Sequence, residues 1–412
     1  MNSLLLVLPS STYRTNAFME AAARLDVTVL VASDHRQAMA ALVPDTTLAL
    51  NFRKPEQIRE KIASYFEKNP FLTAIGVDDQ SAHVAAQINE TLGLPGIPVE
   101  ATAAARNKYL MRQKLAAADV NVPNFDLHSL EKPQPDKPVY PCVLKPTFLS
   151  ASRGVTRANK PGEFSQAFSA LRELIRTPEI SARAHDGEAA SILVEDYVPG
   201  MEVALEGILT DGDFKSLAIF DKPDPLEGPH FVETIYVTPS RLPAYVQREL
   251  IHETHKAALA LGIDNGPVHA ELRVNEQGAW IIEIAARSIG GLCSRVLRFS
   301  EKLVLEDLIL RQAIGVDISE VQRERQAAAV MMVPIPSAGR LKRVGGVDEA
   351  SAVEGVEDVI ISIPNGQEVL PMPFGGRYLG FIFARADMPE EAEDSIRRAH
   401  ACLKIEIDDG TA

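Results

Sequence analysis

Apolar runs and helical patterns alternate along the first part of the chain. Residues 3–8 form an apolar run, whereas residues 14–24 carry apolar positions at helical spacing. This alternation predicts a parallel sheet covered by helices on both faces, an α/β unit that ends at the turn Leu94-Pro95-Gly96. The expected strands are 3–8, 27–32 and 73–76, and the expected helices are 14–24, 56–67 and 79–92.

The pattern changes after an Ala-rich helix at 101–118 and a Pro-rich surface connection at 131–141. Several strands then follow one another, which predicts antiparallel pairing and an α+β unit. The tail, about 325–405, again mixes strands and helices. The expected strands are 139–145, 191–195, 201–209, 214–220, 231–237, 267–274 and 279–284, and the expected helices are 161–175, 241–261 and 301–314.

Charge and cysteine content narrow the class of protein. The chain carries 42 Lys and Arg against 56 Asp and Glu, a net charge of −14, so neither nucleic acid nor an anionic membrane is an expected partner. The three cysteines lie far apart and form no CxxC pair, which suits the reducing cytoplasm. The first apolar run lacks a basic start and stops at Pro9, so it predicts a buried strand rather than a signal peptide.

The strongest local pattern is a β-hairpin over residues 266–287. With a three-residue loop at 276–278, Glu271 faces Glu283 on one side of the hairpin, beside His269 and Arg273. The residues expected on the opposite, apolar side are Val268, Ala270, Leu272, Val274, Trp280, Ile282 and Ile284.

Two carboxylates placed this close together must share a proton or a cation. Oxygen ligands of this kind suit Mg²⁺. The alternative is a different register in which one of the two glutamates faces water. Arg287, four residues beyond Glu283 and just before Gly290-Gly291, could clamp a phosphoryl group, although a surface arginine before an ordinary turn is the better explanation of this feature taken by itself.

Phosphate binding must use other means than the common glycine motifs, since neither GxxxxGK[ST] nor GxGxxG occurs. Lys145 ends an apolar strand and precedes a loop of small and hydroxyl residues, 147–154, whose backbone could enclose phosphates. The alternative is a lysine that simply reaches water from the strand end. Glu195 and Glu202 flank a turn suited to an adenine and a ribose.

The order Lys108, Lys145, small-residue loop, Glu195–Glu202, Glu271, Glu283 and Arg287 resembles the ATP-grasp superfamily. Within it, Phe231-Val232-Glu233 and the run from Glu283 to Gly291 look like bacterial L-amino acid ligases that make dipeptides. The resemblance implies an ATP-grasp fold with four units. They are an N-terminal Rossmann-like unit at 1–100, a linker helix and small lid at 101–187, a larger subdomain at 188–315, and a mixed α+β C-terminal unit at 316–412.

The implied activity is ATP-dependent joining of a small carboxylic acid and an amine through an acyl-phosphate, with ATP and Mg²⁺ or Mn²⁺ as cofactors. Glu271 and Glu283 would bind the metal, Arg287 would stabilise the phosphorylated intermediate, and Glu233 and His269 are the candidate bases. The positions implied to contact ATP are Lys108, Lys145, Glu195, Tyr197, Val198, Glu202 and Lys222, with Ser150, Ser152, Arg153 and Gly154 in a flexible lid. The positions implied to line the acceptor pocket are Glu233, Tyr236, Ser288, Gly290 and Gly291.

Two positions depart from the resemblance. Many members carry Asn as a third metal ligand where this chain has Ala285, and the dipeptide ligases carry His where it has Tyr236. The acid and amine therefore stay open, and dimers are common among relatives. The competing hypotheses are an ATP-grasp carboxylase, a purine-pathway ligase, or a nucleotide-binding protein without catalysis.

Overall fold

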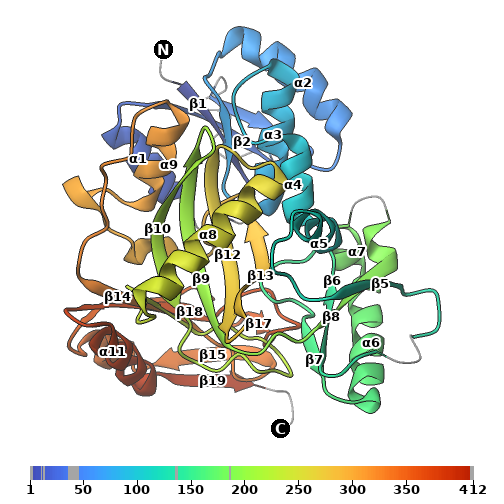
Figure 1. Cartoon of the computed structure of the whole chain (residues 1–412). Helices are drawn as coiled ribbons and strands as arrows, with labels where there is room; N and C mark the ends of the chain where they lie inside the picture. The colour runs from blue at the N-terminus through green and yellow to red at the C-terminus, as the bar shows by residue number, and fades with distance from the viewer. Residues whose placement is uncertain are drawn as a thin grey trace.

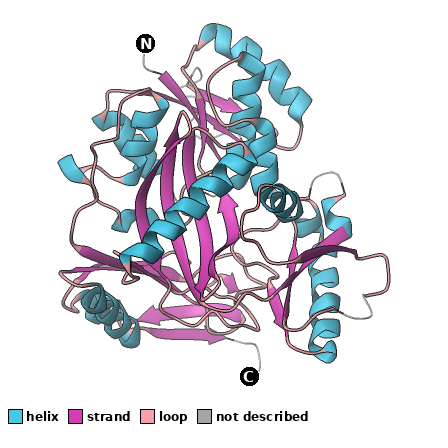
Figure 2. Cartoon of the chain, in the orientation of Figure 1, coloured by secondary structure: helices cyan, strands magenta, loops and turns pink. Residues whose placement is uncertain are grey.

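The computed structural model describes residues 3–10, 12, 14–35, 46–134, 138–184 and 187–408. The N-terminal unit lies at the top of Figure 1, a small sheet with its helices lies at the right, and the C-terminal unit runs along the bottom. A large sheet occupies the centre, and Figure 2 shows helices along its outside. Among the described helices, none has both the length and the apolar character that a membrane span requires.

The N-terminal unit is the expected parallel sheet, with strand order β3-β2-β1-β4. Every residue of β1 is buried because helices cover both faces of the sheet. The short strand β3 was not expected from the sequence. The elements are β1 (Ser3–Leu8), α1 (Thr15–Arg24), β2 (Thr28–Ser33), β3 (Thr47–Ala49), α2 (Pro55–Lys68), β4 (Ala74–Gly76) and α3 (Asp79–Leu92).

The single helix expected at 101–118 is wrong, because the chain breaks at Asn107 into α4 (Val99–Arg106) and α5 (Lys108–Ala117). The Asn107 side chain accepts hydrogen bonds from the backbone N–H groups of Tyr109 at 3.0 Å and Leu110 at 3.1 Å. Asparagine is a favoured N-cap because its side-chain oxygen satisfies the free N–H groups of a helix start. Lys108 therefore stands at the first position of a helix.

The small sheet is antiparallel, with strand order β5-β8-β6-β7. It includes β5, which the sequence pattern did not reveal, and β8, which the expected boundary at residue 187 assigned to the larger subdomain. The elements are β5 (Phe125–Ser129), β6 (Cys142–Pro146), β7 (Thr156–Ala158), α6 (Pro161–Arg176), α7 (Pro178–Ser181) and β8 (Ser191–Asp196).

The large sheet has eight strands in the order β13-β12-β9-β10-β11-β14-β18-β16, so the tail extends the sheet of the larger subdomain. Strand β11 is shorter than expected and begins at Ile235. The strands are β9 (Met201–Thr210), β10 (Asp213–Asp221), β11 (Ile235–Thr238), β12 (Gly266–Asn275), β13 (Gly278–Ala285), β14 (Ala327–Val333), β16 (Val356–Ile361) and β18 (Gly380–Ala386). A separate sheet contains β15 (Gly339–Gly345), β17 (Glu368–Val369) and β19 (Lys404–Asp408).

Helices cover the large sheet, and α8 crosses its face in Figure 1. The apolar side of β12 and β13 packs beneath α8, together with α4 and α5. The opposite face shares a core with the N-terminal sheet and α9. The remaining helices are α8 (Ala244–Leu261), α9 (Leu305–Ala313), α10 (Val347–Ser351) and α11 (Pro389–Cys402).

The β12–β13 hairpin is present, but its loop has two residues instead of the expected three. Asn275 pairs with Gly278, and the register then shifts between Leu272 and Glu271 because Ile282 is an extra residue, a β-bulge. The bulge restores the expected pairing of Glu271 with Glu283. The shorter loop moves side chains between faces in the segment before the bulge. The expectation for Trp280 and Ile282 was therefore wrong, and Ala279 and Ile281 occupy the core with Val268, Ala270, Leu272 and Ile284.

Candidate active site

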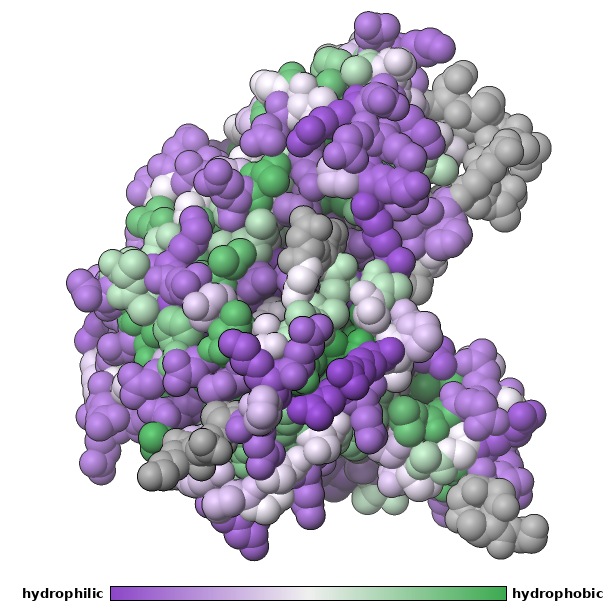
Figure 3. All heavy atoms as spheres, turned by 90° about the vertical axis from the view of Figure 1, so that its right-hand side faces the viewer, coloured by the Kyte–Doolittle hydropathy of each residue, from purple (hydrophilic) through white to green (hydrophobic). Residues whose placement is uncertain are grey.

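A cleft lies between the small sheet and the β12–β13 side of the large sheet, and it brings together residues that are far apart in the sequence. The molecular outline in Figure 3 is hollowed below the N-terminal unit. The predicted residues that line the cleft are Lys108, Lys145, Ser152, Glu195, Tyr197, Val198, Glu202, Glu271 and Glu283.

Lys145 reaches the cleft from the end of β6 and is buried. Its Nζ lies 2.5 Å from Glu195, and the same carboxylate accepts a hydrogen bond from Nε of Arg112 at 2.6 Å. Burial lowers the pKa of Lys145, and the charge of Glu195 opposes that shift. Glu195 thus anchors Lys145 and Arg112. Its backbone pairs with both β5 and β6, and its role with adenine stays a prediction.

An apolar slot forms the part of the cleft beside Tyr197 and Val198. Arg273 holds this segment, because its Nη1 donates to the hydroxyl of Tyr197 and to the carbonyl of Val198, both at 2.9 Å. The ring centroids of Tyr197 and Phe231 lie 6.4 Å apart in a stacked arrangement. Apolar walls with a few fixed polar groups are typical of small-molecule sites. The apolar residues of the slot are Val143, Leu149, Val155, Phe231 and Ile282.

Three carboxylates surround the buried ammonium of Lys222. Nζ lies 2.8 Å from Glu202, also contacts Glu233, and lies 3.7 Å from Glu271. Burial alone would lower the pKa of Lys222, but these charges outweigh it and hold the pKa well above its ordinary value. Glu202 also accepts from Nε of Arg273 at 2.9 Å, so cations engage both of its oxygens, and its role with a ribose stays a prediction.

Glu233, a predicted base, has a raised pKa. The hydroxyl of Tyr236 donates to it at 2.8 Å. Burial, reinforced by the negative charge of Glu271, raises the pKa of Glu233 to about 7, although Lys222 opposes the shift. General bases work best with a pKa near the operating pH.

His269, the other predicted base, lies between two carboxylates. Its Nδ1 bonds the buried carboxylate of Glu206, and its Nε2 lies 3.6 Å from Glu271. Burial would lower the pKa of His269, but the charge of Glu206 outweighs it and raises the pKa to about 9. This pKa favours the protonated imidazole at neutral pH. Against the effect of burial, the charge of Lys222, followed by the hydrogen bond and charge of His269, lowers the pKa of Glu271.

The acidic groups of the site fit a divalent cation. Oxygen atoms of Glu202, Glu233 and Glu271 lie within 4.8 Å of one another, a spacing that one ion can bridge. Glu283 stands opposite Glu271 in the hairpin and lies 3.0 Å from Nζ of Lys108, which also donates to the carbonyl of Leu149 at 2.8 Å. The predicted ligands Glu271 and Glu283 thus lie on one face of the hairpin, and Glu271 also belongs to the three-carboxylate group.

Arg287 is fixed by the N-terminal unit. Its Nε and Nη2 donate to the two oxygens of Asp79 at 2.9 and 3.3 Å. Arg14 holds the next two residues, because its Nη1 donates to the hydroxyl of Ser288 at 2.7 Å and to the carbonyl of Ile289 at 3.1 Å. The sequence pattern gave no signal for Asp79 or Arg14, since each lies more than 200 positions before its partner.

The predicted lid lies between β6 and β7. The backbone N–H of Gly154 donates to the carbonyl of Pro373 in the C-terminal unit at 3.1 Å, and Arg153 lies 3.3 Å from Glu179. Gly154 has φ +78°, a conformation that favours glycine. A second cavity of about 340 Å³ extends from the lid toward the N-terminal unit. Its lining includes Asp79, Arg106, Lys108, Ser150, Arg153 and Glu283.

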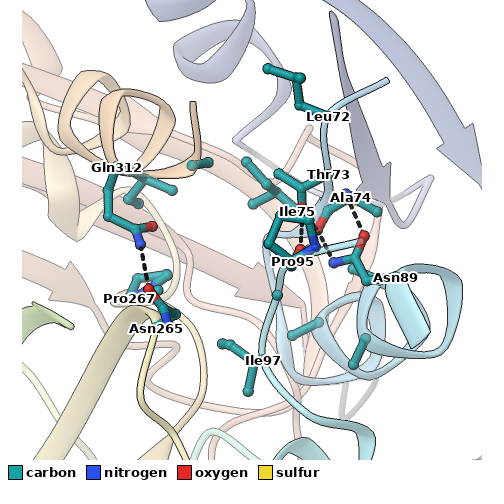
Figure 4. A pocket seen from close by; sticks show the side chains of 18 of the residues that line it. Leu72, Thr73, Ala74, Ile75, Asn89, Pro95, Ile97, Asn265, Pro267 and Gln312 are labelled. Carbon is teal, nitrogen blue, oxygen red and sulfur yellow. Dashed lines mark hydrogen bonds between the residues drawn. The ribbon is translucent and has the colours of Figure 1, made fainter. Parts of the chain in front are cut away.

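A third cavity, of about 490 Å³, is lined by Ala286 and by residues of the N-terminal unit and α9, and it is shown in Figure 4. Its walls are mainly apolar, and several of its polar side chains are engaged by protein: Asn89 bonds the backbone of Ala74, and Gln312 donates to Asn265 at 3.3 Å. None of the predicted site residues lines it. The first two cavities, by contrast, are both lined by the predicted residues Lys108 and Glu283.

Three family models match the chain: an ATP-grasp N-terminal domain at 19–96, an ATP-grasp domain at 138–296, and the L-amino acid ligase C-terminal domain 2 at 331–408. Alanine–anticapsin ligase of Bacillus subtilis is 31% identical over 221 residues, which are 50% of this chain and 46% of that protein. Dapdiamide A synthase of Enterobacter agglomerans is 28% identical over 62% of this chain and 61% of its own length. The chain thus spans less than two thirds of either relative.

Solved structures resemble the whole chain. The crystal structure of an L-amino acid ligase from Bacillus licheniformis superposes with a TM-score of 0.81 and 25% identity, covering 99% of this chain and 100% of that one. N5-carboxyaminoimidazole ribonucleotide synthetase from Thermotoga maritima, at 14% identity and a TM-score of 0.70 with 99% of this chain covered and 100% of that one, shares the fold.

Proposed function

Because this chain belongs to the ATP-grasp superfamily, we propose that it is an ATP-dependent carboxylate–amine ligase that joins two amino acids, or an amino acid and a related acid, into an amide. The reaction passes through an acyl-phosphate and releases ADP and phosphate. The observation that carries the proposal is the pairing of Glu271 with Glu283 at the meeting point of Lys108 and Lys222.

Nucleotide binding is assigned to the cleft. The adenine ring lies in the apolar slot between Phe231 and Ile282, beside Tyr197 and Val198. Lys108 and Lys145 face the phosphates, and the lid with Ser150, Ser152, Arg153 and Gly154 covers them. A lid of this kind excludes water, which protects a reactive acyl-phosphate from hydrolysis.

Activation of the acid requires phosphorylation, because oxide is a poor leaving group and phosphate is a good one. The acid oxygen attacks the γ-phosphorus, and the bond to the β-phosphate oxygen breaks to release ADP. Positive charge from Lys108, Lys145 and Arg287 stabilises the oxygens of the phosphoryl group. Mg²⁺ held by Glu271 and Glu283 supplies further charge neutralisation when it is bound.

The amine then attacks the acyl carbonyl, and phosphate leaves. Glu233, with a pKa near neutrality, accepts the proton that the amine loses. Tyr236 donates to Glu233 and fixes its position, and the segment Ser288–Gly291 borders the acceptor. In this mechanism, phosphoryl transfer occurs at the β12–β13 hairpin and amide formation occurs beside Glu233.

Pairs of amino acids, incubated with the purified protein and MgATP, test this function by ADP release and by mass detection of the product. The proposal expects ADP and a dipeptide or amino-acid amide with at least one pair. Parallel reactions with bicarbonate or ribosyl amines identify a carboxylase or a purine-pathway ligase instead. Nucleotide binding with no ADP formation in any reaction contradicts a ligase and favours a non-catalytic role.

A further inference from the structure

The segment that carries Lys222 is anchored at both of its ends by an aspartate. Asp221 ends β10, and Asp224 lies three residues later, with Lys222 and Pro223 between them. Lys222 contacts Glu202 and Glu233 and faces Glu271 from this short stretch. A shift of either aspartate would therefore displace Nζ of Lys222 from the carboxylates of Glu202, Glu233 and Glu271.

Each aspartate is bound to an arginine outside the site. Asp221 accepts from the backbone N–H and from Nε of Arg241, both at 2.9 Å, and from the hydroxyl of Ser240 at 2.5 Å. Asp224 accepts from Nη2 of Arg397 at 2.6 Å and also bonds the hydroxyl of Thr234, the residue that follows Glu233. The same contacts thus restrain both the Lys222 segment and the Glu233 segment.

One carboxylate of the last helix joins the two arginines. Glu393 of α11 accepts from Nη1 of Arg241 at 2.8 Å through one oxygen, and from Nε and Nη2 of Arg397 at 3.0 and 2.9 Å through the other. Its side chain is only 17% exposed. An isolated surface pair contributes little, but a connected group with two bonds to one arginine restrains geometry.

We infer that Glu393 is a positioning residue, which holds Lys222 and Glu233 in register with Glu271 by fixing Arg241 and Arg397. The inference rests on the proposed function, because Lys222 and Glu233 are the groups that it positions. The C-terminal unit, whose helix α11 packs against β11, β14 and β18, thereby contributes to the chemistry without contacting a substrate.

The adjacent residue supplies a matched control. Asp394 lies on the same helix and pairs with Arg398 at 2.8 Å, with both side chains more than half exposed. We compare Glu393→Gln with Asp394→Asn in ADP release from MgATP and a mixture of amino acids. Small misplacements of catalytic groups have large effects on turnover, so Glu393→Gln is expected to lower kcat about ten-fold and to leave KM for ATP within about two-fold.

Amide hydrogen exchange gives a readout that does not depend on activity. Glu393→Gln should accelerate exchange over residues 222–234, and Asp394→Asn should leave these amides unchanged. Equal kcat and equal exchange in the two variants would overturn the inference. If the wild-type protein releases no ADP, the proposed function fails, while the exchange comparison still decides whether Glu393 holds this segment.

Discussion

Glu271 stands directly opposite Glu283 across the β12–β13 hairpin, and the extra residue Ile282 creates this register. Without the bulge, the two-residue loop would pair Glu271 with Ile282 and turn Glu283 to the opposite face of the sheet. The arrangement concentrates negative charge beside Lys108 and the group of Glu202, Glu233 and Glu271. A bound divalent cation would reduce the repulsion between these carboxylates.

Glu283→Gln should therefore weaken activity that depends on Mg²⁺. A neutral amide is a poorer ligand than a carboxylate, so the Mg²⁺ concentration for half-maximal ADP release should rise by about ten-fold or more. Chelation with EDTA should abolish ADP release from the wild-type protein. Glu276→Gln, in the exposed hairpin loop, is the matched control and should behave like wild type. Full activity of Glu283→Gln at low Mg²⁺ would contradict the metal assignment.

Arg287→Ala should lose most turnover. Removing a cation that stabilises charge in a transition state typically costs about 10²–10³ in kcat, whereas ATP affinity should stay within about three-fold. Arg287→Lys should not restore the rate, because lysine cannot reproduce the bidentate contact with Asp79.

The free energy of unfolding must be measured for Arg287→Ala as well, because the variant leaves the Asp79 carboxylate without its partner. Burial alone would raise the pKa of Asp79, and the charge of Arg287 lowers it. Arg295→Ala, which removes an exposed pair with Asp358, is the control for loss of an arginine. Unchanged turnover of Arg287→Ala would remove Arg287 from its assigned role.

Gly154→Ala should strain the lid. Gly154 has φ +78°, and an added Cβ would lie 2.8 Å from a side-chain carbon of Leu171. The expected loss of stability is about 1–3 kcal/mol, measured by denaturant unfolding, together with a higher KM for ATP. Gly162→Ala in α6 meets open space and should change stability by no more than about 1 kcal/mol. Equal stability of the two variants would show that the lid tolerates a side chain at Gly154.

Thiol reactivity should distinguish the three cysteines. Cys142 and Cys293 are buried, whereas Cys402 is partly exposed. Burial raises the pKa of the Cys142 thiol to about 11 and also raises that of Cys293, so both stay protonated and unreactive at neutral pH. Titration of the native protein with a disulfide reagent should therefore detect one thiol rapidly, and all three after denaturation. Rapid reaction of Cys142 would indicate opening of the β6 region in solution.

Local patterns predicted the elements well where an element is apolar along one face or, as in the N-terminal strands, along both faces. The parallel sheet of the N-terminal unit, α8 and the β12–β13 hairpin all follow from apolar spacing. Asn107 could have been recognised as an N-cap, but the Ala-rich surroundings make one long helix look continuous. The bulge at Ile282 has no local signal, because a single extra residue leaves the apolar pattern of both strands plausible.

The sequence predicted which residue types belong to the site, but it did not predict which of these residues form ion pairs with one another. Lys145 and Glu195 were both expected at the nucleotide, but only the fold reveals that one neutralises the other. The protonated state of His269 depends on Glu206, which is 63 residues away. Such long-range pairs shift the pKa of each group, and no pattern along the chain encodes them.

The bond from Gly154 to Pro373 joins main-chain atoms only, so it depends on the backbone conformation, which favours glycine at position 154, and not on the side chain of either residue. Other residues of the two loops could change while this hydrogen bond between the lid and the C-terminal unit stays in place. A C-terminal segment from a homologous ligase would therefore keep the link wherever its backbone presents a carbonyl at the position of Pro373.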